Sequence, residues 1–207
     1  MKARRSVMTL LGVAFSMNAL AIPVLDQTTQ FEGPNVSVDF FHLGIQAAQT
    51  FRVGITGTLV ELDILASGPG NFFVDIRGQT ASHPDNAVVL QTVNVGAFAT
   101  GGIHSTAIPL NVPVTRNELL SFVVYGAHSG DELHGHTDGY ADGDFWVFGN
   151  PPFGLDGPGT WYPNGGRSQP LDLAFRTLVE PAAPVPEPGT LTLLALGLAG
   201  LGLSKRK

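Results

Sequence analysis

Turn-forming residues interrupt the middle of the chain about every 8–12 residues, and this spacing constrains the fold more than any other feature. The chain has 26 Gly and 15 Pro among its 207 residues. Short runs of β-branched and aromatic residues lie between the interruptions, a pattern typical of an all-β sandwich or barrel. Coiled coils and long helical bundles are excluded, because their sequences contain almost no Gly or Pro.

We expect one all-β domain between two short terminal segments. Residues 72–77 and 171–176 alternate between apolar and more polar side chains, and within residues 58–66 Val60, Leu62 and Ile64 share the apolar face. A period of two is what half-buried strands require. The segment Ser67–Asn71 predicts a turn. The expected strands are Gln49–Ile55, Thr58–Ala66, Phe72–Arg77, Val88–Val95, Ser105–Leu110, Leu119–Tyr125, Phe145–Phe148 and Leu171–Val179. Eight strands predict a two-sheet antiparallel β-sandwich with a jelly-roll-like arrangement.

The N-terminus has the three-part layout of a secretory signal peptide. The cationic segment Met1–Arg5 precedes an apolar stretch, Val7–Leu20, and the small residues Ala19 and Ala21 stand at the −3 and −1 positions of a cleavage site. This order predicts a signal peptide over residues 1–21, cleaved after Ala21. The alternative is an N-terminal helix of the folded domain.

The C-terminus combines a proline-rich motif, an apolar stretch and a basic end. Residues Leu191–Leu203 contain no charge, and Ser204–Lys207 end the chain with three cations. A helix of this length spans about 20 Å, which is less than the hydrocarbon core of roughly 30 Å. We therefore expect a short transmembrane helix that inserts weakly, with its basic end in the cytoplasm.

The motif Pro186-Glu187-Pro188, followed by this apolar helix and basic end, resembles the PEP-CTERM sorting signal. The resemblance covers residues 185–207. It implies processing near the motif by a membrane exosortase in an exopolysaccharide-producing Gram-negative bacterium. An ordinary C-terminal anchor is the alternative. The expected domain organisation is then 1–21 signal peptide, 22–184 extracellular β-sandwich and 185–207 sorting tail.

Two stretches of the middle region resemble the bacterial surface domains called choice-of-anchor domains. The first is Ala48–Phe51 leading into Gly54–Leu59, and the second is Asp172–Thr177. The resemblance implies a β-sandwich exported to the cell surface. It implies no particular activity and no functional residue.

The charge of residues 22–184 disfavours several classes of partner. This region has five Arg against sixteen Asp and Glu, a net charge of −11, and every Lys lies in the two terminal segments. Such a surface repels nucleic acids and anionic lipids. It suits cations, or neutral glycans held by hydrogen bonds and stacking. The absence of Cys excludes disulfides and thiolate metal sites.

Acidic and His residues are densest between His128 and Asp144. Asp138, Asp142 and Asp144 lie in a Gly-containing segment, and Ca²⁺ takes six to eight oxygens from loops of this kind. They are candidate calcium ligands, although the spacing is not that of an EF-hand. The alternative is a solvated acidic loop.

The same segment contains the motif His134-Gly135-His136. Together with His128, these side chains are candidate zinc ligands. A single pair of His residues two apart is weak support for a metal site.

Aromatic residues gather before and within a Gly/Pro-rich stretch, residues 149–166. Trp146, Trp161 and Tyr162 are candidate glycan-binding residues, because flat rings stack on sugar faces. Trp161 is expected in an exposed loop. The alternative is that Trp146 and Phe148 face the core, since residues two apart in a strand share a face.

No catalytic residue is predicted. The sequence has no nucleophile elbow, no zinc-protease motif and no Gly-rich phosphate loop. We expect a non-catalytic exported protein of the cell surface or extracellular matrix, transiently anchored in the inner membrane, processed by an exosortase and able to bind exopolysaccharide. The alternatives are a secreted hydrolase that acts on polysaccharide, and a purely structural matrix protein that binds its own kind.

Overall fold

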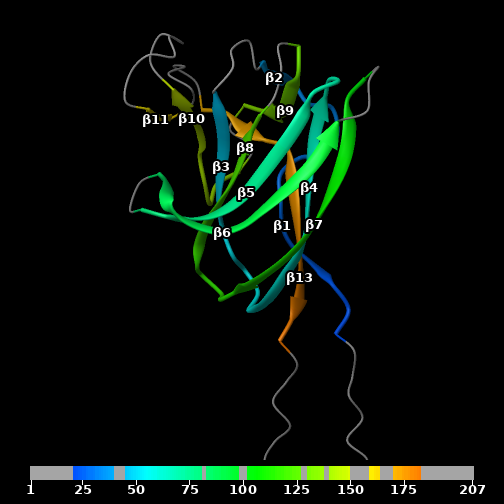
Figure 1. Cartoon of the computed structure of the whole chain (residues 1–207). Coiled ribbons are helices and arrows are strands. Elements are labelled where there is room, and N and C mark those ends of the chain that lie inside the picture. Colours follow the sequence, from blue (N-terminus) through cyan, green and yellow to red (C-terminus); the bar gives the residue numbers. More distant parts are fainter. Residues whose placement is uncertain are drawn as a thin grey trace, which may run out of the picture.

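The computed structural model describes residues 21–39, 45–80, 83–97, 102–126, 130–137, 140–149, 159–163 and 170–182. All regular elements in these ranges are β-strands, and they form two antiparallel sheets (Figure 1). This confirms the predicted β-sandwich. No helix in the described ranges has the length and apolar character needed to cross a membrane. The predicted signal peptide and sorting tail lie outside the described residues, apart from Ala21.

The first sheet has seven strands in the order β1-β13-β4-β9-β12, with β2 paired to β9 and β7 paired to β4. Its central part is β4, which pairs with β13 on one side and β7 on the other. The strands are β1 (Val24–Thr28), β2 (Val36–Asp39), β4 (Gly57–Ser67), β7 (His104–Val114), β9 (Glu132–His136), β12 (Asp172–Leu173) and β13 (Phe175–Pro181).

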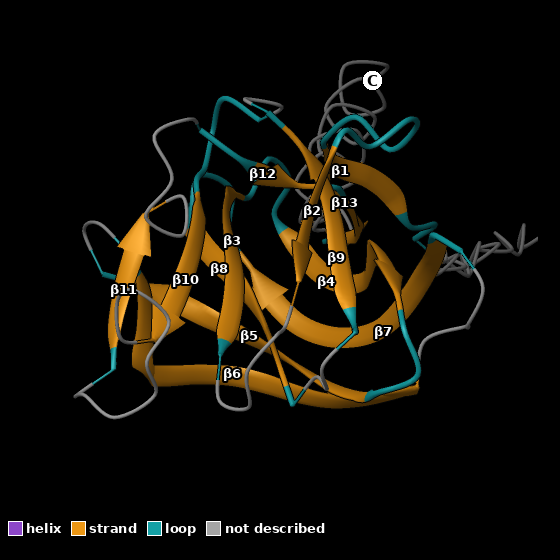
Figure 2. Cartoon of the chain, turned by 90° about the horizontal axis from the view of Figure 1, so that it is seen from above, coloured by secondary structure: helices purple, strands orange, loops and turns teal. Residues whose placement is uncertain are grey.

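The second sheet has six strands in the order β11-β10-β3-β8-β5-β6. The strands are β3 (Gln46–Arg52), β5 (Asn71–Gln79), β6 (Pro84–Ala97), β8 (Leu119–Tyr125), β10 (Phe145–Gly149) and β11 (Thr160–Pro163). Figure 2 shows β11 and β6 at the two borders of this sheet.

The main core lies between the sheets and follows the predicted alternation. In β5, Phe72, Val74 and Ile76 are fully buried in it. Phe175 of β13 reaches the same core and packs edge-on against Phe122 of β8, with ring centroids 5.4 Å apart. The period of two therefore placed the apolar sides of these strands correctly.

The alternation predicted for residues 58–66 is wrong at one position. The pairing of β4 with both neighbours shifts register around Val60. A β-bulge turns the following residues to the opposite face. Leu59 and Leu62 are consequently both in the core, whereas Val60 is only half-buried.

Thirteen strands are present in the described residues, against the eight predicted. The additional ones include β9, which lies within the polar segment His128–Asp144 and is not predicted by any alternation of apolar residues. Its polar side chains are accommodated in a sheet because β9 pairs with β2, β4 and β12.

The predicted turn between β4 and β5 is confirmed, and Asp131 holds it. The Asp131 carboxylate accepts a hydrogen bond from the Gly70 N–H at 2.9 Å. Gly68 has φ +126°, and a Cβ there would collide with Asp131. Only glycine adopts this backbone conformation at low cost, so the turn and Asp131 require each other.

A buried polar network joins the two sheets. The Asp172 carboxylate accepts hydrogen bonds from the Gln49 side chain and from the Tyr140 N–H, each at 2.9 Å. The Tyr140 hydroxyl donates to the Gln27 side chain at 2.8 Å and accepts from the Arg52 N–H at 3.3 Å. Because buried polar groups need partners, this network fixes how the sheets align.

Candidate functional site

Aromatic side chains gather on the face of the six-stranded sheet that points away from the main core. We call this set the outer aromatic face. Its members are Phe73, Tyr125, Trp146, Phe148 and Trp161.

The register of the sheet explains why these residues share one face. Trp146 lies opposite Ala48, Phe148 lies opposite Trp161, and Phe73 lies opposite Tyr125. Residues directly opposite each other in antiparallel strands point to the same side. Phe145 and Val147, which alternate with Trp146 and Phe148, belong to the main core. The alternative in which Trp146 and Phe148 face the core is therefore wrong.

The outer aromatic face is curled. The indole Nε1–H of Trp161, on one edge strand, donates to Asn86 Oδ1, on the other edge strand, at 3.2 Å. In a flat six-stranded sheet these edges would be about 24 Å apart. Figure 1 shows the long curved course of β5 and β6. Trp161 is consequently only 6% exposed.

A buried ion pair anchors this face. The Asp75 carboxylate accepts hydrogen bonds from Arg77 at 3.0 Å (Nε) and 2.6 Å (Nη2). It also accepts from the Thr92 hydroxyl at 2.7 Å and the Tyr125 hydroxyl at 3.1 Å. Burial raises the pKa of Tyr125, and the Asp75 charge adds to the shift. Arg77 Nη1 continues the network to Asn86 Oδ1 at 2.8 Å.

Beneath this face, some buried polar atoms have no hydrogen-bond partner among the described residues. They are Gln46 Oε1, Ser121 Oγ and Trp146 Nε1. All three side chains lie on the outer side, because Gln46 pairs with Phe148, Ser121 with Arg77 and Trp146 with Ala48. Buried polar atoms are usually satisfied, so these three set the outer aromatic face apart from an ordinary apolar core.

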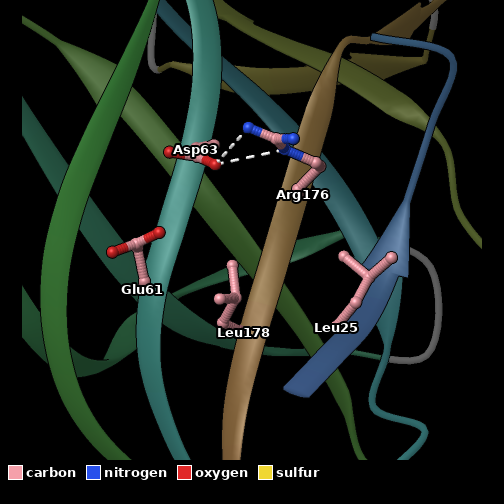
Figure 3. A pocket seen from close by; sticks show the side chains of 5 residues that line it. All are labelled: Leu25, Glu61, Asp63, Arg176 and Leu178. Carbon is pink, nitrogen blue, oxygen red and sulfur yellow. Dashed lines mark hydrogen bonds and ion pairs between the residues drawn. The ribbon is translucent and has the colours of Figure 1, made fainter. Parts of the chain in front are cut away.

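The outer side of the seven-stranded sheet is different. It contains a shallow depression of about 330 Å³ lined by five side chains of β1, β4 and β13 (Figure 3). Arg176 donates to Asp63 Oδ2 at 3.1 Å (Nε) and 2.7 Å (Nη2), and its guanidinium lies 4.3 Å from the centre of the Phe31 ring. The other lining residues are Leu25, Glu61 and Leu178.

The three predicted glycan-binding residues do not act as one exposed group. Trp146 is half-buried on the outer aromatic face. Trp161 is in β11 and buried beside Phe148, with ring centroids 5.1 Å apart. The expectation of an exposed loop Trp161 is wrong. Tyr162 pairs with Val147 of the main core, so it points to the opposite side of the sheet.

The predicted calcium site is described only in part. Asp138 lies outside the described residues, and both Asp142 and Asp144 are exposed. The backbone of Asp144 is bonded to Thr50, whose hydroxyl accepts from the Asp144 N–H at 2.7 Å. Among the described residues no group of three or more His, Asp and Glu is arranged to hold a metal ion. A site that includes Asp138 stays a prediction.

The predicted zinc ligands are also incomplete, since His128 lies outside the described residues. His134 and His136 are buried on the side of β9 opposite Leu133, which is in the main core. His134 Nε2 lies 3.0 Å from Ser67 Oγ and 3.6 Å from a Glu132 oxygen. These contacts give His134 a structural role at the β4–β9 junction.

Sequence reasoning missed Phe73 and Tyr125 as surface aromatics. Their rings stack at 5.5 Å with an interplanar angle of 19°, and both are half-buried. The available signal was the alternation of 72–77, which places Phe73 on the side away from Phe72. The pairing with Tyr125 depends on the register between β5 and β8, which no local pattern contains.

Comparison with known proteins gives one match. Residues 184–207 match the family described as the PEP-CTERM protein-sorting motif. No curated protein and no solved structure matches the chain significantly. The resemblance to choice-of-anchor domains therefore stays a prediction, as do the signal peptide and the domain boundaries.

Proposed function

We propose that the chain, whose C-terminal tail directs an exported protein to the envelope and implies exosortase processing, is a non-catalytic module that binds exopolysaccharide on its outer aromatic face. One observation supports this most. Phe73, Tyr125, Trp146 and Phe148 all stay half-buried on one face of the six-stranded sheet. Aromatic rings that keep solvent-accessible area can stack on the faces of sugars.

The end of the described chain lies away from the Phe73–Tyr125 pair. Pro181 of β13 pairs with Gly57, which also pairs with Val114, and the turn after Val114 leads into Leu119 of β8. Tyr125 is at the other end of β8. The last strand, which the sorting tail follows in the sequence, therefore ends at the end of the sandwich opposite this pair, and this arrangement supports display of the pair away from the membrane.

The binding proposal is tested by co-sedimentation of the exported protein with the exopolysaccharide of the producing strain. Trp146→Ala and Phe73→Ala each remove one accessible ring. We expect each to weaken binding about tenfold, equivalent to about 1.4 kcal/mol. Phe31→Ala is the matched control, because Phe31 packs on Arg176 at the other sheet. Equal binding by all variants, or none by the natural chain, contradicts the proposal.

The same experiment separates a binding module from a polysaccharide hydrolase. A binding module releases no reducing ends from the polymer during prolonged incubation. Steady release of reducing ends, absent from a heat-denatured sample, identifies an enzyme instead. A chelator arm tests calcium: loss of binding on chelation, restored by added Ca²⁺, supports ligation by Asp138, Asp142 and Asp144.

Delivery to the surface or matrix rests on the sorting tail. Deleting residues 185–207 removes the motif Pro186-Glu187-Pro188 together with the apolar and basic segments. We expect the shortened protein to be lost from the surface and matrix fractions. Unchanged localisation contradicts the role of the tail. It does not bear on glycan binding, which the co-sedimentation assay tests separately.

A further inference from the structure

The edge strand β6 has an exposed apolar segment. Val88, Val89 and Leu90 are consecutive and 43%, 45% and 43% exposed. Among the described residues, β6 pairs with β5 alone. The Asn111 N–H of β7 donates to Gln91 Oε1 at 2.8 Å, which is a side-chain contact. No backbone hydrogen bond in the described ranges joins Val88–Leu90 to a strand other than β5.

The other described edge strands are protected in ways that β6 is not. β1, β2, β11 and β12 have five residues or fewer. β7 has eleven residues but contains Pro109 and Pro113, which cannot donate to a partner strand. β6 has fourteen residues, and its one proline is the first of them. Short edges and edge prolines are devices that prevent edge-to-edge pairing, and β6 has neither, although its pairing with β5 shifts register on both sides of Val89.

Charge also distinguishes β6. No charged residue lies between Asp85 and His104, whereas residues 22–184 have a net charge of −11. Two copies of this chain repel each other through most of their surfaces. They meet without like-charge repulsion where both present the segment from Ala87 to Ala97.

We propose that β6 is a self-association surface on which a second copy of this chain docks through antiparallel pairing of the two β6 strands. The pair is two-fold symmetric, so each copy offers the same open backbone edge and the same three aliphatic side chains. Six strands of each copy then join in one continuous sheet. This inference rests on β6 alone and stands independently of glycan binding.

The absence of Cys makes a direct test available, because each introduced cysteine is the only one in the chain. Single variants from Ala87→Cys to Val95→Cys are made in the full chain, solubilised in mild detergent, and oxidised gently. Opposite Cα atoms in antiparallel strands are about 4.5–5.5 Å apart, within the range that a disulfide spans. In a two-fold symmetric pair of strands, one residue lies directly opposite the same residue of the other copy. We therefore expect the yield of disulfide-linked dimer to be highest for cysteine at that position and low for cysteine two residues away.

Controls and a second measurement complete the test. Leu25→Cys and Ile103→Cys alter residues that are 53% and 48% exposed, and both should give little dimer. In the chain without cysteine, Leu90→Lys should reduce dimer in sedimentation velocity at least tenfold, whereas Ile103→Lys should not. A flat cross-linking profile, equal yields in the controls, or an adduct with another protein overturns the proposal.

Discussion

The two outer faces of the sandwich each contain an Asp–Arg pair of nearly identical geometry, yet the pairs differ in environment. The shortest contact is 2.6 Å between Arg77 and Asp75 and 2.7 Å between Arg176 and Asp63. The Arg77 side chain is 9% exposed, whereas that of Arg176 is 41% exposed. The extent to which neighbouring side chains bury each pair therefore decides how much the pair contributes to stability. The Asp75–Arg77 pair is part of a second small core, whereas Arg176 of the other pair borders water.

The largest effect is expected at the covered pair. Asp75→Ala leaves the Arg77 guanidinium buried without its carboxylate and removes the acceptor of Thr92 and Tyr125. Removal of one partner from a buried pair costs about 3–5 kcal/mol. Urea unfolding of the exported protein measures this loss. A loss below about 1 kcal/mol would mean that the two faces are energetically alike.

Loss of an apolar side chain should also destabilise the protein more on the outer aromatic face than on the outer side of the seven-stranded sheet. Trp161→Ala removes a buried ring packed on Phe148 together with its bond to Asn86, and we expect a loss of about 3 kcal/mol. Leu25→Ala, at the half-exposed depression of the other face, should change stability by less than about 0.5 kcal/mol. Equal losses in urea unfolding would contradict the view that Trp161 closes a second core.

The alternation of apolar and polar residues predicted most of the fold, because it reflects what a half-buried strand needs. Residues 119–125 form β8 within the predicted bounds, and the sandwich follows from the number of strands. The strand β9 was missed because Glu132, His134 and His136 are polar. His134 and His136 are buried in a sheet only through contacts with segments distant in sequence, such as Ser67.

The candidate site was less predictable for a related physical reason. A period of two tells which residues share a face, and it correctly grouped Phe73 with Asp75 and Arg77. It does not tell what covers that face. Trp161 is buried because the sheet curls until β11 meets Asn86 of β6, and this curl depends on long-range register. The exposed residues of the site are consequently different from those that composition suggested.

Between the two faces, Tyr140 gives the core a sensitivity to high pH. Burial raises the pKa of Tyr140 from 10.0 to about 12. As the pH rises, the hydroxyl of Tyr140 therefore loses its proton in the unfolded state before it does so in the folded state. Its contribution to the free energy of unfolding is complete below pH 10 and is lost as the pH rises to about 12. The shift corresponds to about 3 kcal/mol at most, and solvent screening reduces this to about 1–2 kcal/mol.

Tyr140→Phe isolates this effect. The variant loses the bond to Gln27 at every pH, so its stability curve is lower at neutral pH. Between pH 10 and 12 its stability should fall less steeply than that of the natural chain, because the raised pKa of Tyr140 contributes to the slope of the natural chain alone. Parallel curves in urea unfolding across this range would contradict the assignment of the slope to Tyr140.

The smallest effect is expected at the pair that borders water. Arg176 is 41% exposed and can reach solvent when its partner is neutralised, so Asp63→Asn should cost about 0–1 kcal/mol. The comparison becomes sharpest in double-mutant cycles, which measure the coupling of each pair separately. We expect the Asp63–Arg176 coupling to weaken as salt rises toward 1 M, where the screening length is about 3 Å. The Asp75–Arg77 coupling should change little over the same range, because the groups that cover it exclude salt. If both couplings respond equally to salt in urea unfolding, the outer aromatic face admits water and is not a second core.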